Sequence, residues 1–213
     1  MQQRIILVLA LVSFACNTKG MQTPIHSTQK NTKTMTDSLQ IATFAGGCFW
    51  CTEAVFLEVK GVKKVVSGYT GGFIKNPAYR EVCNGTTGHA EAIQIFYNSD
   101  EVAYEDLLEI FFATHDPTTL NRQGADVGTQ YRSAIFYQSD EQKQKAARYM
   151  DWLVKEKLYE NPIVTKIEPA GAFYNAEDYH QNYYNQNQEQ GYCQMVIAPK
   201  LEKLRKYYKS KLK

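Results

Sequence analysis

Apolar and polar residues alternate with two different periods along the middle of the chain. Five short runs of apolar or alternating residues, which have the length and period of β-strands, cover residues 41–45, 62–68, 89–97, 133–137 and 163–167. Three longer segments, 48–59, 104–114 and 140–159, have apolar residues three or four positions apart and predict helices. Because the run at 89–97 is apolar on both alternating faces, we expect its strand at the centre of the sheet. The pattern indicates an α+β fold, a two-layer sandwich of helices packed on a mixed β-sheet with a ferredoxin-like core.

The last third of the chain is less regular. Residues 175–190 are polar and aromatic, and a helix is expected only around 176–184. The tail from Lys200 predicts a basic amphipathic helix at the surface. Two polar segments, 69–88 and 118–132, are too long and too rich in chemically active residues to be simple connections. We therefore expect a long irregular C-terminal segment and two functional loops.

The N-terminal residues have the composition of a targeting segment. Residues 1–15 carry an early positive charge, an apolar run and small residues, which predicts a signal peptide. The ending before Cys16 resembles a bacterial lipoprotein signal, so Cys16 is the candidate lipidation site; the alternative is an ordinary signal peptide. Residues 16–37 have few large apolar side chains and predict a polar tether. We thus expect an exported protein, periplasmic or membrane-anchored through a lipid in a bacterium, with its catalytic domain at 38–213.

Composition narrows the class of protein further. A chain of 213 residues, 44% apolar and 22% charged, is typical of one globular domain, which we expect to be monomeric. Its net charge of +2 gives no reason to expect a nucleic-acid partner. Of five cysteines, four fall in the predicted domain, and an exported domain lies where disulfides can form.

The stretch from Phe44 to Cys51 carries the first candidate for chemistry. A short strand is followed by Gly46 and Gly47, and Cys48 then opens a helical segment. Unpaired N–H groups at the start of a helix attract negative charge, so they are expected to lower the pKa of the Cys48 thiol and favour the nucleophilic thiolate. The glycines permit a tight turn and leave room for a substrate. The sequence therefore predicts Cys48 as a catalytic nucleophile.

Cys51 makes a C-x-x-C pair with Cys48, and this pair is compatible with two mechanisms. In one, the two thiols form the redox couple of a thioredoxin-like thiol–disulfide oxidoreductase. In the other, Cys48 acts as the nucleophile and the adjacent Phe49 and Trp50 form an apolar wall. A zinc site is disfavoured because the chain has only one close cysteine pair, so no metal is expected.

Four further residues are candidates for acid–base or oxyanion chemistry. Glu91 shares a strand face with apolar residues, and desolvation would raise the pKa of its carboxyl and make it a proton donor. The alternative is that Glu91 lies at a strand end and points into water. The loops add Tyr79, Asp126 and Tyr131, and phenolic hydroxyls can donate to an oxyanion. Their convergence is not visible from the sequence.

Taken together, several motifs resemble the type A peptide methionine sulfoxide reductase family. In chain order these motifs are Gly46-Gly47-Cys48-Phe49-Trp50, Gly68-Tyr69-Thr70-Gly71-Gly72, Asn76-Pro77-Ala78-Tyr79, Gly88-His89-Ala90-Glu91, His115-Asp116-Pro117-Thr118, the run from Arg122 to Ser133, and Ala176-Glu177-Asp178-Tyr179-His180-Gln181. They extend in order from about residue 41 to Cys193, so the resemblance covers nearly the whole predicted domain.

The resemblance implies a role for each candidate residue. Cys48 would attack the sulfur of a methionine sulfoxide, of the S epimer in type A enzymes, and Glu91 would supply the proton that lets the oxygen leave. The other implied roles belong to Tyr79, Tyr131 and Asp126, which would orient the oxygen, and to Phe49 and Trp50, which would hold the substrate methyl group. The substrates would be oxidised proteins or peptides containing methionine sulfoxide, and the free amino acid.

The resemblance also implies how the enzyme is recycled. Attack would leave a sulfenic acid on Cys48, which a resolving cysteine converts to a disulfide. The C-terminal Gly191-Tyr192-Cys193 matches the family position of that cysteine, whereas Cys51 replaces a glycine of many relatives and is the alternative. Cys83 is expected to be structural. No cofactor would be bound; an external thioredoxin-like reductant, here an exported thioredoxin-fold partner, would reduce the disulfide.

Overall fold

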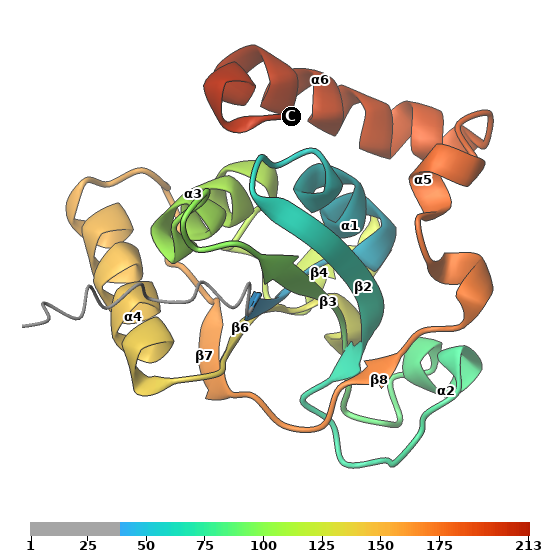
Figure 1. The fold of residues 1–213 in the computed structure, drawn as a ribbon. Coiled ribbons are helices and arrows are strands. Elements are labelled where there is room, and N and C mark those ends of the chain that lie inside the picture. The colour runs from blue at the N-terminus through green and yellow to red at the C-terminus, as the bar shows by residue number, and fades with distance from the viewer. Residues whose placement is uncertain (1–38) are drawn as a thin grey trace, which may run out of the picture. The chain divides into compact units, whose positions relative to one another are not determined.

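In the computed structural model, which describes residues 39–213, a six-stranded sheet forms the centre of the fold (Figure 1). Its order is β7-β6-β1-β3-β2-β8, with β1 (Gln40–Gly46), β2 (Val62–Thr70), β3 (Ala90–Tyr97), β6 (Ser133–Tyr137), β7 (Lys166–Pro169) and β8 (Tyr174–Asn175). Neighbouring strands are antiparallel except β6 and β7, which are parallel. The predicted α+β class, the mixed sheet and the central place of β3 are confirmed.

Four helices longer than two turns accompany the sheet: α1 (Phe49–Leu57), α3 (Tyr104–Thr114), α4 (Asp140–Lys155) and α6 (Ala198–Tyr208). The shorter elements are α2 (Tyr79–Cys83), α5 (Tyr183–Gln186), the hairpin of β4 (Arg122–Gln123) and β5 (Asp126–Val127), the 3₁₀ turns η1 (Thr129–Tyr131), η2 (Asp178–His180) and η4 (Lys209–Lys211), and the π-helical turn η3 (Cys193–Ile197). Among residues 39–213, no helix is both long enough and apolar enough to cross a membrane.

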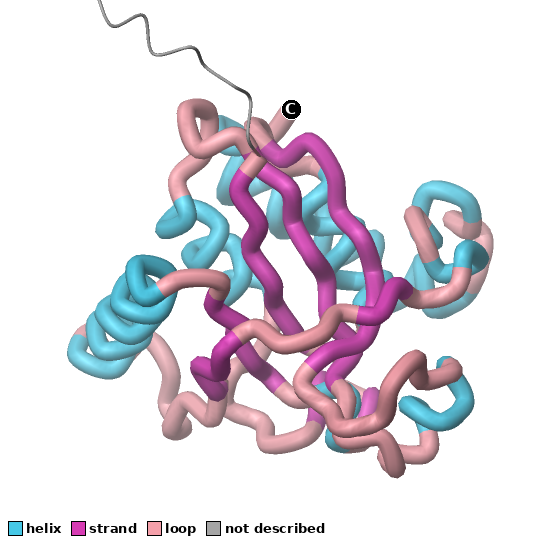
Figure 2. Tube along the Cα trace, turned by 60° about the horizontal axis from the view of Figure 1, so that its bottom comes forward, coloured by secondary structure: helices cyan, strands magenta, loops and turns pink. Residues whose placement is uncertain are grey.

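The two faces of the sheet are covered differently. Figure 2 shows the strands of the sheet with helices behind one of its faces. The face toward α1 and α3 carries large side chains, among which Phe44 stacks on Phe111 at 4.8 Å between ring centroids. On the opposite face the buried positions are mostly alanine, and the chain between β7 and β8 packs there through Ala170 and Phe173. Small residues let a backbone approach a sheet closely, so this face is covered by an extended segment rather than by a helix.

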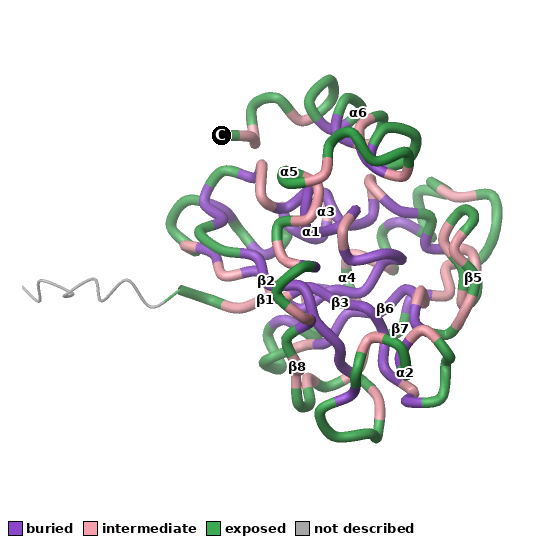
Figure 3. Tube along the Cα trace, turned by 90° about the vertical axis from the view of Figure 1, so that its right-hand side faces the viewer, coloured by how far each residue is buried: buried purple, intermediate pink, exposed green. Residues whose placement is uncertain are grey.

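The segment after β8 is held to the rest of the molecule by its own polar groups. The Ala176 N–H donates to the Ser67 carbonyl at 2.9 Å, and the Ser67 N–H donates to Oε1 of Gln181 at 3.0 Å. Figure 1 shows the segment running from β8 along the side of the sheet to α5, and Figure 3 shows that it lies largely at the surface. An irregular chain is thereby fixed beside α1, where the candidate residues gather.

Several predicted boundaries are wrong for local reasons. The helix expected to reach residue 159 ends at Lys155, because Lys157 adopts a left-handed backbone (φ 53°) and Leu158 N–H donates to the Leu153 carbonyl. The helix expected over 176–184 is only two short turns, broken where Asn182 has φ 51°. The last predicted strand lies three residues later than expected, and the 69–88 loop contains α2. The predicted signal peptide, tether and Cys16 fall outside the described residues.

Candidate active site

Cys48 lies at the N-cap of α1, immediately after the turn that follows β1. The turn requires Gly47, because its φ is +90° and a Cβ there would lie 2.6 Å from the Gln123 side chain. The Cys48 carbonyl accepts the Cys51 N–H at 3.1 Å, and its side chain is 8% exposed. The thiol is thus placed at the first turn of the helix, as the sequence predicted, but almost entirely out of water.

Glu91 reaches the same helix end from β3. It is 1% exposed, and its Oε2 accepts the Phe49 N–H at 3.1 Å. Burial raises the pKa of the Glu91 carboxyl to about 8, and the neighbouring Asp126 and Cys51 add to the rise, whereas the Phe49 hydrogen bond opposes it. Glu91 does lie near the start of β3, but the alternative that its side chain points into water is wrong. At neutral pH Glu91 is a protonated acid beside Cys48.

The predicted lowering of the Cys48 pKa is wrong for this state of the molecule. Burial raises the pKa of the Cys48 thiol well above its ordinary value, and the neighbouring Cys51 and Glu91 raise it further. The pKa of Cys51 is lowered to about 7, chiefly by a hydrogen bond from Cys48. The two neighbouring thiols thus shift in opposite directions: the pKa of Cys48 is raised and that of Cys51 is lowered.

Tyr192 links the thiol pair to Asp126. Its hydroxyl donates to Asp126 Oδ2 at 2.8 Å and lies 3.5 Å from the Cys51 sulfur. Asp126 lies on β5, in the 118–132 segment far from Cys51 in sequence. The Tyr192 side chain nevertheless connects it to the Cys51 thiol. The sequence analysis did not identify Tyr192 as a site residue. Its position directly before Cys193, the candidate resolving cysteine, was the one sequence feature that pointed to it.

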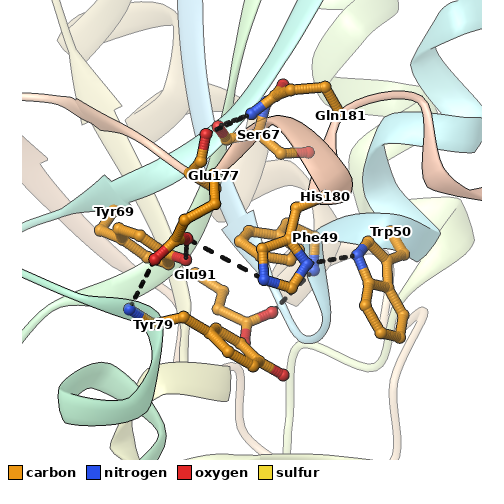
Figure 4. A network of polar contacts seen from close by, with 10 residues as sticks. Phe49, Trp50, Ser67, Tyr69, Tyr79, Glu91, Glu177, His180 and Gln181 are labelled. Atoms are coloured by element: carbon orange, nitrogen blue, oxygen red, sulfur yellow. Dashed lines mark hydrogen bonds and ion pairs between the residues drawn. The ribbon is translucent and has the colours of Figure 1, made fainter.

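The predicted apolar wall consists of two aromatic rings held in different ways (Figure 4). Phe49 is 1% exposed and packs against Tyr69 with ring centroids 5.8 Å apart. Trp50 is half-buried; its ring stacks on Tyr183 at 3.7 Å and 6°, and its Nε1–H donates to Nδ1 of His180 at 3.1 Å. Both rings therefore contact the segment after β8: Trp50 through Tyr183 and His180, and Phe49 through His180, with ring centroids 5.1 Å apart.

Tyr79 and Tyr131 approach the acid from two loops. Tyr79 begins α2, and its N–H donates to Oε1 of Glu177 at 3.0 Å, while Oε2 of the same carboxylate accepts the Tyr69 hydroxyl at 2.8 Å. Tyr131 ends η1 and packs against the core. The pKa values of the Tyr79 and Tyr131 phenols are raised first by burial, and Glu91 raises both further. Both hydroxyl-bearing rings thus lie near the same acid.

The remaining cysteines differ in accessibility. Cys193 begins η3 and is fully buried; burial, and then the nearby Cys51, raise the pKa of its thiol. Cys83 ends α2, is partly exposed and lies beside Tyr79. Within residues 39–213 every cysteine is a free thiol. The structure thus brings Glu91, Cys51 and Tyr131 close to Cys48, and it buries Cys193.

Comparison with known proteins agrees with this arrangement. The family model described as "Peptide methionine sulfoxide reductase" matches residues 40–212. The chain belongs to the peptide methionine sulfoxide reductase family. It is therefore an enzyme, an oxidoreductase acting on methionine sulfoxide, and the family predicted from the motifs is confirmed. Membership favours the sulfoxide reductase over the thioredoxin-like interpretation of the cysteine pair.

Individual relatives of this reductase are similar over most of their length. It is 60% identical to a peptide methionine sulfoxide reductase MsrA of Deinococcus radiodurans over 172 residues, 81% of this chain and 84% of that one. An MsrA of Chromobacterium violaceum is 55% identical over 80% of this chain and 97% of its own. Among solved structures, reduced Mxr1 from Saccharomyces cerevisiae superposes with a TM-score of 0.65 at 37% identity, covering 73% of this chain and 90% of that one.

Proposed function

We propose that this enzyme reduces methionine-S-sulfoxide, in proteins, in peptides and as the free amino acid, to methionine. The observation that carries the proposal is the buried Glu91 carboxyl. Its pKa is about 8, and it accepts a hydrogen bond from the N–H of Phe49, the residue that follows Cys48. A sulfoxide oxygen is a weak leaving group until it is protonated, and a neutral buried carboxylic acid beside a thiol supplies that proton.

The first step balances with the groups present. Glu91 gives its proton to the sulfoxide oxygen, the Cys48 sulfur attacks the substrate sulfur, and the thiol proton passes to the Glu91 carboxylate. As the substrate S–O bond breaks, the oxygen is transferred to Cys48 as a sulfenic acid and methionine is released. The substrate sulfur is reduced by two electrons and the Cys48 sulfur is oxidised by two.

The surrounding residues orient the substrate. Tyr79 and Tyr131 lie near Glu91 and would donate to the sulfoxide oxygen, with Asp126 acting through water. Phe49 and Trp50 would hold the methyl group, since the Phe49 ring is buried and the Trp50 ring is fixed by two partners. These assignments follow from the family resemblance and are supported by the convergence of the five side chains.

The sulfenic acid is then converted to a disulfide with release of water. We propose Cys193 as the resolving cysteine, from its family position, with Cys51 as the alternative. The closeness of Cys51 to Cys48 and its lowered pKa favour the alternative, whereas Cys193 is fully buried and the pKa of its thiol is raised by burial. After one turnover without reductant, mass spectrometry of the Cys51→Ser and Cys193→Ser variants would show which disulfide forms.

An external dithiol must close the cycle, because each turnover oxidises two protein thiols. We propose a thioredoxin-fold protein as this donor. The activity is tested by supplying dithiothreitol in its place and following each sulfoxide epimer separately. Reduction of the S epimer and not of the R epimer is expected. Folded protein that leaves the S epimer unreduced would overturn the proposal, and reduction of protein disulfides that depends on Cys51 but not on Glu91 would support the thioredoxin-like alternative.

Two finer assignments remain proposals of ours. The element order β1-α1-β2-β3-α3-β6, with the strands adjacent in the order β6-β1-β3-β2, supports the ferredoxin-like core. Export with lipidation at Cys16 rests on the composition of residues 1–37, and mass spectrometry of the mature N-terminus tests it. A mature N-terminus at a lipidated Cys16 is expected, and an intact Met1 would refute export.

A further inference from the structure

Glu53 is a buried carboxylate that the proposed reaction does not use. It lies on α1 one turn after Trp50 and is 2% exposed. Its Oε1 accepts the Asn182 N–H at 2.8 Å, and its Oε2 accepts the Tyr183 N–H at 3.3 Å. Both carboxylate oxygens therefore hold consecutive backbone amides of the C-terminal segment, 129 and 130 residues away in sequence.

These two hydrogen bonds fix the point at which the segment turns toward Trp50. Asn182 is in the left-handed region, with φ 51°, a conformation that a non-glycine residue adopts only where its surroundings favour it. The next residue, Tyr183, places its ring 3.7 Å from Trp50 and nearly parallel to it. His180, two residues before Asn182, accepts the indole N–H of Trp50. The bonds to Glu53 thus lie in the same short stretch, 180–183, that contacts Trp50.

We propose that Glu53 is a positioning residue for the substrate wall: its carboxylate clamps residues 182–183 so that Tyr183 holds Trp50 in place. The inference rests on the proposed role of Trp50 in binding the sulfoxide methyl group. Glu53 contacts no reacting group. Its loss would therefore leave the reaction of bound substrate at Cys48 nearly unchanged and weaken the binding of substrate against a mobile indole.

A glutamine in place of Glu53 tests the clamp with little change of shape. Glutamine offers one acceptor oxygen and turns an NH₂ group toward the second amide, so one buried N–H loses its partner. From the loss of one hydrogen bond to a charged group we expect KM for a methionine sulfoxide peptide to rise about tenfold. We expect kcat to stay within about twofold, since only uniform binding is lost.

Fluorescence quenching reports directly on how accessible the Trp50 indole is in protein that circular dichroism shows to be folded. The chain has two tryptophans, and Trp152 is 47% exposed, so a Trp152→Phe background leaves Trp50 as the single tryptophan. In this background Glu53→Gln is expected to increase quenching of Trp50 by acrylamide, and Tyr183→Ala to do the same. Glu141→Gln is the matched control, because that side chain is 75% exposed and lies on α4.

The outcomes separate the clamp from the proposed function. A folded Glu53→Gln protein with unchanged KM and unchanged quenching would overturn the clamp, whatever the activity of the parent. A parent that does not reduce the S epimer would instead overturn the proposed function, and quenching would still report on the clamp. If Glu53→Gln does not fold, amide hydrogen exchange in the unaltered chain decides. Slow exchange at residues 182 and 183 supports the clamp, and exchange as fast as at exposed Asn185 contradicts it.

Discussion

The site is built by two regions that are held together in different ways. Cys48 and Glu91 come from β1, α1 and β3, where backbone pairs within the sheet and the helix fix the chain. Tyr192, His180 and Tyr183 come from residues 174–197, where the chain is irregular and mostly exposed. This second region, the C-terminal segment at residues 174–197, we call the C-terminal wrap. It is fixed by side-chain groups: the Glu53 carboxylate accepts the Asn182 N–H of the wrap, and the Gln181 side chain of the wrap accepts the Ser67 N–H.

Because the two regions are held in different ways, we expect them to have different roles. A sheet and a helix hold the reacting atoms with little freedom, as bond formation between two sulfurs requires. The wrap carries side chains that hold Trp50, for which we propose a role in substrate binding, and it carries Cys193, the proposed resolving cysteine. Substitutions in the sheet-and-helix region should therefore remove chemistry, and substitutions in the wrap should mainly weaken binding and recycling.

The sharpest test of this division is Cys48→Ser. A serine hydroxyl is a far weaker nucleophile than a thiol and cannot form the sulfenic acid, so reduction in a single turnover is expected to fall below detection. Quantifying methionine after one turnover without reductant measures this step alone. Cys83→Ser is the control and should retain single-turnover activity; methionine formed by Cys48→Ser would show that another thiol is the nucleophile.

The second largest effect is expected from Glu91→Gln, which keeps the shape and hydrogen-bonding oxygen of the side chain but removes its transferable proton. Loss of general-acid catalysis typically lowers kcat by about 10²–10⁴-fold. Stopped-flow measurement of the first turnover would isolate this step. An effect confined to KM would mean that Glu91 positions the substrate and that the sheet-and-helix region does not supply the acid.

The same residue predicts a pH dependence. The Glu91 carboxyl has a pKa of about 8, so it is protonated below that value and loses its proton as the pH rises through it. The rate of the first turnover should therefore fall above about pH 8, and this fall should vanish in Glu91→Gln. A profile that stays level through pH 9 in the unaltered enzyme would contradict the assignment of Glu91 as the acid.

Sequence patterns predicted the sheet-and-helix region far better than the wrap. The periods of two and of three to four residues are set by burial, so they located β1, α3 and β6 almost to the residue. They put Glu91 on a strand face with apolar residues, but they left open whether its carboxyl is buried, as it is in the structure. The wrap has no such period, because its hydrogen bonds come from residues such as Glu53 that are more than a hundred positions away. The prediction of a lowered Cys48 pKa was wrong for a related reason. The burial of one thiol depends on the tertiary fold, which the position at a helix start does not reveal.

Within the wrap, Glu177→Gln should have an intermediate effect. Glu177 accepts the Tyr79 N–H with one oxygen and the Tyr69 hydroxyl with the other, and glutamine retains only one acceptor. We expect kcat/KM to fall about tenfold as Tyr79 loses its position, a change of about 1.4 kcal/mol. Steady-state assays with a sulfoxide peptide measure it, with exposed Asp178→Asn as the control. A fall as large as that of Glu91→Gln would break the division between the two regions.

The smallest effect is expected from Tyr192→Phe, which removes only a hydroxyl from the joint between the regions. Asp126 then loses the donor at 2.8 Å, but the Tyr192 ring keeps its edge-to-face contact with Trp50 at 5.9 Å. Because one hydrogen bond is worth about 0.5–1.5 kcal/mol, kcat/KM should fall about two- to tenfold. Tyr184→Phe, on the neighbouring turn α5, serves as the control in the same assay. If Tyr192→Phe instead abolished turnover while the first reduction at Cys48 remained intact, the hydroxyl would be needed for recycling, and the wrap would take part in the chemistry of the disulfide rather than in binding.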